Sequence, residues 1–414
     1  MKLYISGISG TAMGALAIFA KEAGYEVSGS DLKEGAVSDE LKEKGIEFFI
    51  GKQDGKNLQK KFDKGEVDWF VYTSALSQDN PELVLAKKLG IKTSKRDELI
   101  EKIRKDLRLK MVAVAGTHGK TTTTAMIIYA CKKLGIKVSH LIGSTLGFDE
   151  AGSYKMKSRF LIYEADEYDR NFLHFSPFLS VITTIDYDHP DIYPTKADYD
   201  AAFVKFMRQS KSVIYKTEVE KRLKLAGEVR RIDASLAVEA VLKMQKELKL
   251  PQDRGAIIQA LNDFPGAGRR FERLAEGIYS DYGHHPEEIK ATIGIAQEEA
   301  KKLNKKGIVL IYEPHQNVRQ HEVFNQYRDV FLNVDKLYWL PTFLTRENPE
   351  LLIFKPEDFI ASLENKEIAE PASLDEKFGK KILNYAKENY LVLLMTAGPA
   401  DGWLRDLVTH PKEN

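Results

Sequence analysis

A glycine-rich turn followed by a lysine and threonines is the clearest chemical signal in this sequence. It reads Gly116-Thr117-His118-Gly119-Lys120-Thr121-Thr122-Thr123 and lies between an apolar run, 111–115, and a helical pattern, 121–134. Successive backbone N–H groups and a helix N-terminus in such a turn can bind phosphate oxygens. The strict P-loop pattern also requires glycine at position 114, where this chain has valine. The shorter Gly-Thr-x-Gly-Lys-Thr form still predicts nucleotide binding by Gly116, Thr117, His118, Gly119, Lys120, Thr121 and Thr122.

Two acidic clusters follow this turn along the chain. Glu164-Ala165-Asp166-Glu167 comes after the apolar run 160–163, and Asp186-Tyr187-Asp188-His189 comes after 179–183. An isolated acidic cluster is more often a solvated loop, but a position beside a phosphate turn favours metal binding. A magnesium ion held by phosphates needs only one or two protein oxygens. We therefore predict that the Thr121 hydroxyl and Glu164 bind Mg²⁺.

The last third of the chain carries two further polar clusters. Asp281-Tyr282-Gly283-His284-His285-Pro286 precedes a helical pattern, and Glu313-Pro314-His315-Gln316-Asn317-Val318-Arg319 follows a strand pattern. Paired histidines can simply cap and pack the start of a helix. A zinc site is disfavoured because the chain has one cysteine and no His-x₃-His spacing. We interpret both clusters as contacts to substrate and nucleotide.

Short apolar runs alternate with helical patterns throughout the chain, which is typical of α/β proteins. A charged helical stretch at 95–110 precedes the run that leads into the phosphate turn, and a third set of runs occupies 308–312, 336–340 and 391–395. The length of 414 residues suits about three domains. We predict α/β domains at 1–108, 109–264 and 265–414, the middle one a P-loop ATPase with a mostly parallel sheet.

Composition narrows the classes of partner. Lys and Arg number 62 against 61 Asp and Glu, a net charge of +1 that does not favour a nucleic acid. Cys131 is the only cysteine, which fits a reducing compartment. Gly7 comes too early for the apolar region of a signal peptide, and no apolar run reaches about 18 residues. These features predict a cytoplasmic protein with no nucleic-acid or membrane partner.

Five motifs occur here in one order, and together they resemble the Mur ligases. They are Gly-Thr-His-Gly-Lys-Thr-Thr-Thr at 116–123, Glu-Ala-Asp-Glu at 164–167, Asp188-His189, Gly-x-x-Arg-Arg-Phe at 266–271, and Asp-Tyr-Gly-His-His-Pro at 281–286. The N-terminal Gly7-Ile8-Ser9-Gly10-Thr11-Ala12-Met13 and Gly29-Ser30-Asp31 are similar to the branch that adds L-alanine to UDP-N-acetylmuramate.

The resemblance implies a Rossmann-like N-terminal domain for the UDP-sugar, a central ATPase and a Rossmann-like C-terminal domain. It implies an ADP-forming amide ligase of peptidoglycan precursor synthesis that uses ATP and Mg²⁺. UDP-N-acetylmuramate and an amino acid or peptide acceptor are the implied partners, and the intermediate is an acyl phosphate. The ADP-forming step would rely on Lys120 as a catalytic residue.

The resemblance also assigns roles residue by residue. His189 would bind a second Mg²⁺, and Arg270 and Asp281 would contact the nucleotide. Gly7 and Gly10 would approach the pyrophosphate, and Thr73 and Ser74 would lie in a uridine-side loop. The remaining implied substrate and catalytic residues are Asp31, Tyr282, His284, His315 and Arg319.

Two departures from the family pattern leave alternatives open. The chain passes from Tyr215 to Ile232-Asp233-Ala234-Ser235 without the family's β-rich insertion, which removes an expected adenine-side asparagine. Gln316 stands where L-alanine-adding members usually have arginine. A ligase that recycles murein tripeptide and a degenerate, nucleotide-binding ligase are the alternatives. An NAD-dependent oxidoreductase would leave the phosphate turn unexplained.

Overall fold

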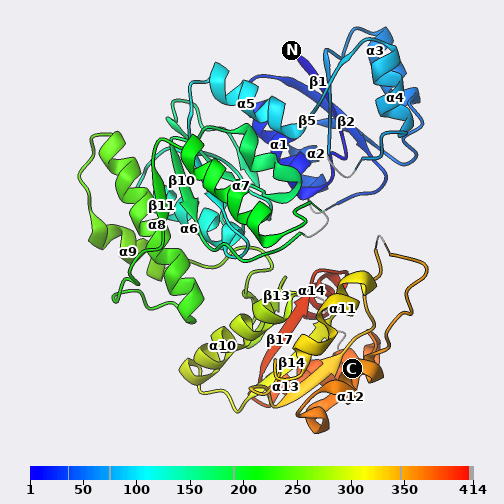
Figure 1. Ribbon diagram of the computed structural model, residues 1–414, viewed down its shortest axis with the longest axis vertical. Helices are drawn as coiled ribbons and strands as arrows, with labels where there is room; N and C mark the ends of the chain where they lie inside the picture. The colour runs from blue at the N-terminus through cyan, green and yellow to red at the C-terminus, as the bar shows by residue number, and fades with distance from the viewer. Residues whose placement is uncertain (36, 74–75, 190–191, 346, 410–414) are drawn as a thin grey trace. The chain divides into compact units, whose positions relative to one another are not determined.

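The computed structural model describes residues 1–35, 37–73, 76–189, 192–345 and 347–409. Its contacts divide the chain into two compact units: Met1–Leu223 with Ile232–Phe264, and Lys224–Arg231 with Pro265–Asn414. The first unit contains two sheets and the second contains one (Figure 1). The expected α/β class with three successive sheets is confirmed. Within the described ranges, no helix combines the length and the apolar character needed to cross a bilayer.

The N-terminal sheet is built entirely of parallel strands. Its strands are β1 (Lys2–Ser6), β2 (Glu26–Asp31), β3 (Glu47–Ile50), β4 (Trp69–Tyr72) and β5 (Lys92–Lys95), and its helices are α1 (Thr11–Glu22), α2 (Ser38–Glu43), α3 (Lys56–Asp63), α4 (Pro81–Lys88) and α5 (Arg96–Asp106). The strand order is β3-β2-β1-β4-β5. Tyr4 and Phe70 pack against α3 and α4 on one face, and α1 and α5 cover the other (Figure 1). The order reverses beside β1, the point where parallel sheets bind ligands.

The central sheet follows directly. Its strands are β6 (Lys110–Ala115), β7 (Ser139–Leu141), β8 (Gly152–Ser153), β9 (Phe160–Glu164), β10 (Leu179–Ile182) and β11 (Val213–Tyr215), and its helices are α6 (Lys120–Lys133), η1 (Tyr168–His174), α7 (Lys196–Gln209), α8 (Glu228–Glu247) and α9 (Arg254–Asn262). The order is β11-β10-β6-β9-β7-β8, and only β7 and β8 pair antiparallel. The turns after β6, β9 and β10 therefore meet at one edge of the sheet. Glu164 is the last residue of β9 rather than the first residue after it.

Strand β8 lies directly on helix α1, so the two sheets of the first unit share a packed contact. A Cβ atom on Gly152 would lie 1.9 Å from the backbone oxygen of Ala15, so only glycine, which has no Cβ atom, fits at this position. The N–H of Tyr154 donates to the Glu22 carboxylate at 2.7 Å. Lys44 joins Glu22 and Glu150 at 2.7 Å each. Close packing and charge together hold α1 against the central sheet.

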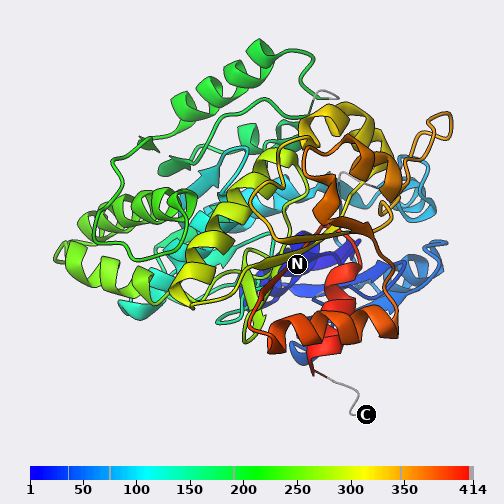
Figure 2. The ribbon, with the colours of Figure 1, turned by 90° about the horizontal axis from the view of Figure 1, so that it is seen from below.

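The C-terminal sheet has helices on both faces. Its strands are β12 (Glu272–Ala275), β13 (Ile278–Asp281), β14 (Ile308–Glu313), β15 (Lys336–Trp339), β16 (Ala369–Pro371) and β17 (Leu391–Thr396), and its helices are α10 (Pro286–Lys302), α11 (Asn317–Val323), η2 (Phe324–Tyr327), α12 (Pro356–Ser362), η3 (Lys366–Ile368), α13 (Glu376–Lys387) and α14 (Ala400–Thr409). The order is β12-β13-β17-β14-β15-β16, with only β12 antiparallel. Val309 and Ile311 face α13 and α14, while Leu310 and Tyr312 face α10 and α12. Figure 2 shows the orange α13 and red α14 together, away from the yellow-green α10.

Candidate active site

The phosphate turn between β6 and α6 requires glycine at two positions. Gly116 has φ +144° and Gly119 has φ +80°, conformations that side chains other than glycine rarely adopt. A Cβ atom on Gly116 would lie 2.1 Å from the Thr183 hydroxyl oxygen, and one on Gly119 would lie 2.5 Å from a carboxylate oxygen of Asp233. The backbone here is thus shaped by close approach of two neighbouring segments.

The loop after β10 fixes this turn from the side. The Thr117 hydroxyl donates to the backbone oxygen of Asp186 at 2.7 Å, and the Asp186 N–H lies 2.8 Å from the same hydroxyl. The His118 N–H donates to the Thr184 hydroxyl at 2.9 Å. Thr122 lies in the first turn of α6, directly after these residues. The structure thus positions every residue of the predicted phosphate turn at one end of α6.

Lys120 is held among oxygen atoms. Its ammonium donates to the Thr117 backbone oxygen at 3.1 Å and to the Glu167 carboxylate at 2.9 Å. Burial alone would lower the pKa of Lys120, but the charge and hydrogen bond of Glu167 outweigh it and raise that pKa. Burial raises the pKa of the Glu167 carboxyl, against the opposing effect of Lys120. Lys120 therefore remains a cation, as a phosphate ligand must be.

Thr121 and Glu164 lie beside each other, as predicted. The Thr121 hydroxyl donates to one Glu164 oxygen at 2.6 Å, and the Gly143 N–H donates to the other at 2.6 Å. A hydroxyl and a carboxylate side by side are the hard oxygen ligands that magnesium prefers. No cluster of three His, Cys, Asp or Glu side chains suited to a metal occurs in the described ranges. The residues thus fit an ion that takes its other ligands from phosphate and water.

His189 lies next to a different carboxylate. Its Nε2 atom is 3.9 Å from Glu167 and 3.5 Å from Asp188, and its backbone has φ +58°. Its ring also meets that of Tyr168 edge to face, with 5.1 Å between centroids. His189 thus shares Glu167 with Lys120, whereas Thr121 and Glu164 form the other pair.

The N-terminal glycine turn brings together four of the five predicted UDP-side residues. A Cβ atom on Gly7, which has φ +80°, would lie 3.3 Å from the Thr73 methyl carbon. The Ser9 N–H donates to the Asp31 carboxylate at 2.9 Å. Gly10 is the N-cap of α1. Ser74 lies outside the described residues.

In the second unit, Asp281, Tyr282 and Arg270 are adjacent. The carboxylate of Asp281 accepts the N–H groups of Phe271 and Gly283, each at 2.7 Å. Burial raises the pKa of Asp281, against the effect of Arg270. The Arg270 guanidinium lies 4.9 Å from the centroid of the Tyr282 ring. Arg270 and Asp281 are thus brought into one cluster with Tyr282.

His284 and His315 meet edge to face, with 5.4 Å between ring centroids. Nδ1 of His284 lies 3.2 Å from the backbone oxygen of Tyr282. Burial lowers the pKa of His284 to about 4, with Glu288 opposing and Arg319 reinforcing the shift. His284 is therefore neutral at physiological pH.

Gln316 begins the helix that carries Arg319. It is the N-cap of α11 with φ +61°, and its N–H donates to the backbone oxygen of Phe343 at 3.0 Å. The His315 ring stacks on Phe343 with 5.8 Å between centroids. Gln316 is partly buried.

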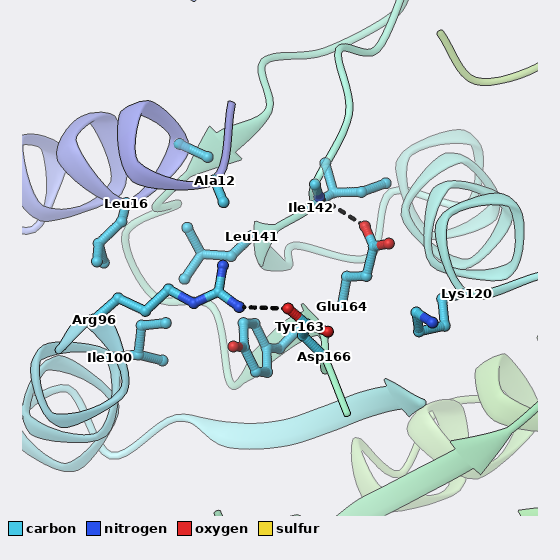
Figure 3. A pocket seen from close by; sticks show the side chains of 12 residues that line it. Ala12, Leu16, Arg96, Ile100, Lys120, Leu141, Ile142, Tyr163, Glu164 and Asp166 are labelled. Atoms are coloured by element: carbon cyan, nitrogen blue, oxygen red, sulfur yellow. Dashed lines mark hydrogen bonds and ion pairs between the residues drawn. The ribbon is translucent and has the colours of Figure 1, made fainter. Parts of the chain in front are cut away.

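A cavity of about 250 Å³ in the first unit joins residues that the sequence did not single out to the phosphate turn. Figure 3 shows Arg96 of α5 with its guanidinium turned toward Asp166, and Glu164 and Lys120 on the other side. Tyr163 of β9 also lines this cavity. Arg96 could not be identified as a site residue from the sequence, because Lys95-Arg96-Asp97-Glu98 is typical of an ordinary charged helix face. A basic residue at the start of a helix was the only local signal.

The chain matches two family descriptions and many curated proteins. "Mur ligase family, catalytic domain" matches residues 2–107 and "Mur ligase middle domain" matches 114–247. A UDP-N-acetylmuramate–L-alanine ligase of Hydrogenobaculum sp. is 30% identical over 460 aligned positions, covering 97% of each chain. One from Campylobacter jejuni subsp. doylei is 32% identical, covering 84% of this chain and 86% of its own.

Solved structures agree in fold. A UDP-N-acetylmuramate-alanine ligase of Thermotoga maritima superimposes with a TM-score of 0.79 at 24% identity, covering 100% of this chain and 99% of its own. A murein peptide ligase of Psychrobacter arcticus gives 0.63 at 20% identity, covering 99% and 98%. With the two domain matches and the full-length curated relatives, the resemblance expected from the motifs is confirmed, and this chain belongs to the Mur ligase family.

Proposed function

We propose that this protein is an ATP-dependent, ADP-forming ligase that joins L-alanine to UDP-N-acetylmuramate through an acyl phosphate. The observation that carries the proposal is the phosphate turn with Lys120 at its end and the Thr121–Glu164 pair beside it. The curated relatives of nearly full length, which are named for this reaction, support the choice of substrates. We assign the UDP-sugar to residues 1–108, ATP to 109–264 and the remaining ligase functions to 265–414.

The first step transfers a phosphoryl group. A carboxylate oxygen of the sugar acid attacks the γ-phosphorus of ATP, the bond from that phosphorus to the β–γ bridging oxygen breaks, and ADP leaves. Phosphoryl transfer depends mainly on positioning and on neutralising charge on the phosphate oxygens. Lys120 supplies a cation, and the N–H groups of the 116–120 turn supply hydrogen bonds. Magnesium, bound by Thr121 and Glu164, would neutralise further phosphate charge.

The second step forms the amide. The amine nitrogen attacks the acyl carbon, the resulting tetrahedral intermediate collapses, and inorganic phosphate leaves with the electron pair of the broken C–O bond. Nδ1 of His284 faces a backbone oxygen, which assigns the proton of the neutral ring to Nδ1 and leaves Nε2 as an acceptor. We assign Nε2 of His284 to accept the amine proton. We assign His315 and Arg319 to hold the incoming amino acid.

Phosphate release tests this proposal. Purified protein is mixed with ATP, Mg²⁺, UDP-N-acetylmuramate and either L-alanine or murein tripeptide, and ADP, phosphate and the amide product are measured. We expect release that requires the UDP-sugar and L-alanine together. Release with tripeptide alone would assign the recycling reaction, which the Psychrobacter arcticus likeness and Gln316 would then explain. ATP binding with no release under any mixture would identify a nucleotide-binding protein without ligase activity.

Lys120→Ala should lower turnover about a thousandfold, since one lost charge at a reacting phosphate costs several kcal/mol. Lys137→Ala removes an exposed lysine just beyond α6 and serves as the matched control. Normal turnover by folded Lys120→Ala protein would refute the assignment of the phosphate turn.

A further inference from the structure

The cavity between α1, α5 and the central sheet is lined by both apolar and charged side chains. Its apolar lining residues are Ala12, Ala15, Leu16, Ile100, Leu141 and Ile142. Its charged lining residues are Arg96, whose guanidinium extends toward Asp166, and, on the other side, Glu164 and Lys120 (Figure 3). At about 250 Å³ the cavity is several times the roughly 30 Å³ that one water occupies in the liquid. We call it the α1–α5 cavity.

Of the two cations in this cavity, Arg96 has unused hydrogen-bonding capacity. Lys120 already contacts two backbone oxygens and Glu167. Arg96 donates from Nη2 to Asp166 at 3.0 Å, and its Nε lies 3.8 Å from Asp97, beyond hydrogen-bond distance. A guanidinium has five donors in a planar fork. Arg96 can therefore keep its hydrogen bond to Asp166 and bind a second carboxylate.

Tyr163 adds an independent sign of a ligand. Its side chain lines the cavity and is 4% exposed, yet its buried hydroxyl has no hydrogen-bond partner among the described residues. A buried hydroxyl without a partner is costly, so native structures normally satisfy such groups. A polar ligand in the α1–α5 cavity would satisfy it.

The cavity also connects the two turns that the proposed reaction uses. Ala12, Ala15 and Leu16 belong to the helix that begins at Gly10, and Lys120 ends the phosphate turn. A sugar acid whose pyrophosphate lies at the N-terminal turn must extend its carboxylate toward Lys120. The apolar residues suit sugar and methyl carbons, and the cations Arg96 and Lys120 are the lining groups that can contact an acid.

We propose that Arg96 binds the carboxylate of the sugar-acid substrate in the α1–α5 cavity, so that it distinguishes an acidic UDP-sugar from a neutral one. This inference rests on the proposed function and adds a substrate-selecting residue to it. Asp166 holds the guanidinium plane in place while its remaining donors face the acid. Arg96 takes no part in bond breaking.

Equilibrium binding of three probes tests this role. UDP, UDP-N-acetylglucosamine and UDP-N-acetylmuramate are titrated by calorimetry into wild type, Arg96→Gln and Arg104→Gln. Arg104 lies on the same helix and forms a two-pronged pair with Glu101 at 2.7 Å, away from this cavity, so it is the matched control. Arg96→Gln should weaken binding of UDP-N-acetylmuramate about 10- to 100-fold. The affinities for the other two probes should change less than about twofold, as should all three in Arg104→Gln.

Arg96→Lys keeps the positive charge but lacks the planar set of guanidinium donors, and it remains informative if Arg96→Gln does not fold. It should bind UDP-N-acetylmuramate with intermediate affinity and the neutral sugar normally. Two outcomes would overturn the role of Arg96: equal weakening of the binding of all three probes, or a variant that keeps an undiminished preference for the acid. In either case, ADP formation by the wild type leaves the proposed function standing. Wild type that binds neither UDP-sugar and forms no ADP would overturn both.

Discussion

The ammonium of Lys120 and the carboxylate of Glu167 lie 2.9 Å apart, with 1% of the Glu167 side chain exposed. The lysine of the phosphate turn is therefore already paired with a buried anion. A nucleotide bound as proposed would have to share or replace that partner, so we expect Glu167 to affect phosphate affinity.

Glu167→Gln should destabilise the free protein and increase the stabilisation that ATP provides. The amide keeps a hydrogen bond but removes the charge opposite a buried cation, which costs about 2 kcal/mol. Bound phosphate would restore the missing negative charge. Thermal unfolding with and without ATP should show a larger ATP-induced rise in Tm for the variant. Glu66→Gln alters the more exposed Lys61–Glu66 pair at 2.8 Å and should change little. An ATP effect no larger than in wild type would contradict this account.

Glu164→Gln should raise the Mg²⁺ concentration needed for half-maximal turnover. The substitution preserves shape beside Thr121 and removes the carboxylate charge. Loss of a group that only supports a metal ligand typically costs about 10- to 100-fold in metal affinity, so loss of charge on a direct ligand should cost at least as much. Turnover is measured against Mg²⁺ at saturating ATP, with Glu218→Gln, on an exposed loop, as control. Superimposable Mg²⁺ curves would show that Glu164 does not serve the metal.

His284 should make the protein less stable in acid. Its pKa falls from the ordinary 6.5 to about 4 on folding, so between these pH values the unfolded chain binds a proton that the folded chain does not. This difference in proton binding contributes about 3 kcal/mol to the free energy of unfolding. The contribution is complete above pH 6.5 and is lost as the pH falls toward 4. Urea unfolding at several pH values should show a smaller acid-induced loss in His284→Gln than in wild type. Parallel curves of stability against pH for the two proteins would argue against a buried neutral imidazole. The variant His321→Gln is the control for loss of a histidine elsewhere in this unit.

Gln316→Arg should improve the use of L-alanine. The guanidinium can bind an amino-acid carboxylate with two hydrogen bonds, whereas the amide is neutral. Charge-assisted hydrogen bonds are worth about 1.5–3 kcal/mol, so kcat/KM for L-alanine should rise roughly ten- to hundredfold with little change in the KM for ATP. Gln316→Lys adds charge without the fork and should give a smaller gain. A fall in kcat/KM would indicate that the pocket accepts a different amine.

The sequence predicted those parts of the fold in which local pattern and burial agree. Strand β6 and helix α6 were expected within one residue at each end, because an uninterrupted apolar run meets a glycine turn and then a long helical pattern. Strand β8 has only two residues and no pattern of its own. Its position comes from packing on α1, which no local spacing reveals.

The candidate site likewise contains one contact that the sequence predicts and others that it does not. The Thr121–Glu164 contact could be expected, since Thr121 lies at the start of the helix that follows β6 and Glu164 ends the neighbouring strand β9. The pairing of Lys120 with Glu167 could not, because the three neighbouring acidic positions 164, 166 and 167 are equivalent in sequence and only the turn after β9 distinguishes them. Arg96 is separated from Asp166 by 70 positions, and its meaning depends on the approach of α5 to β9.

The close contact of Gly152 with α1 bears on the spacing between the N-terminal turn and the phosphate turn. Because its missing side chain lets β8 rest on the backbone of α1, the helix that starts at the N-terminal turn cannot slide along the central sheet without losing this contact. We therefore expect the span from Gly10 to Lys120 to stay nearly constant when ligands bind. Under the proposed function, a sugar nucleotide whose carboxylate lies too near its pyrophosphate, or too far from it, should bind at the N-terminal turn and still fail to reach the γ-phosphate.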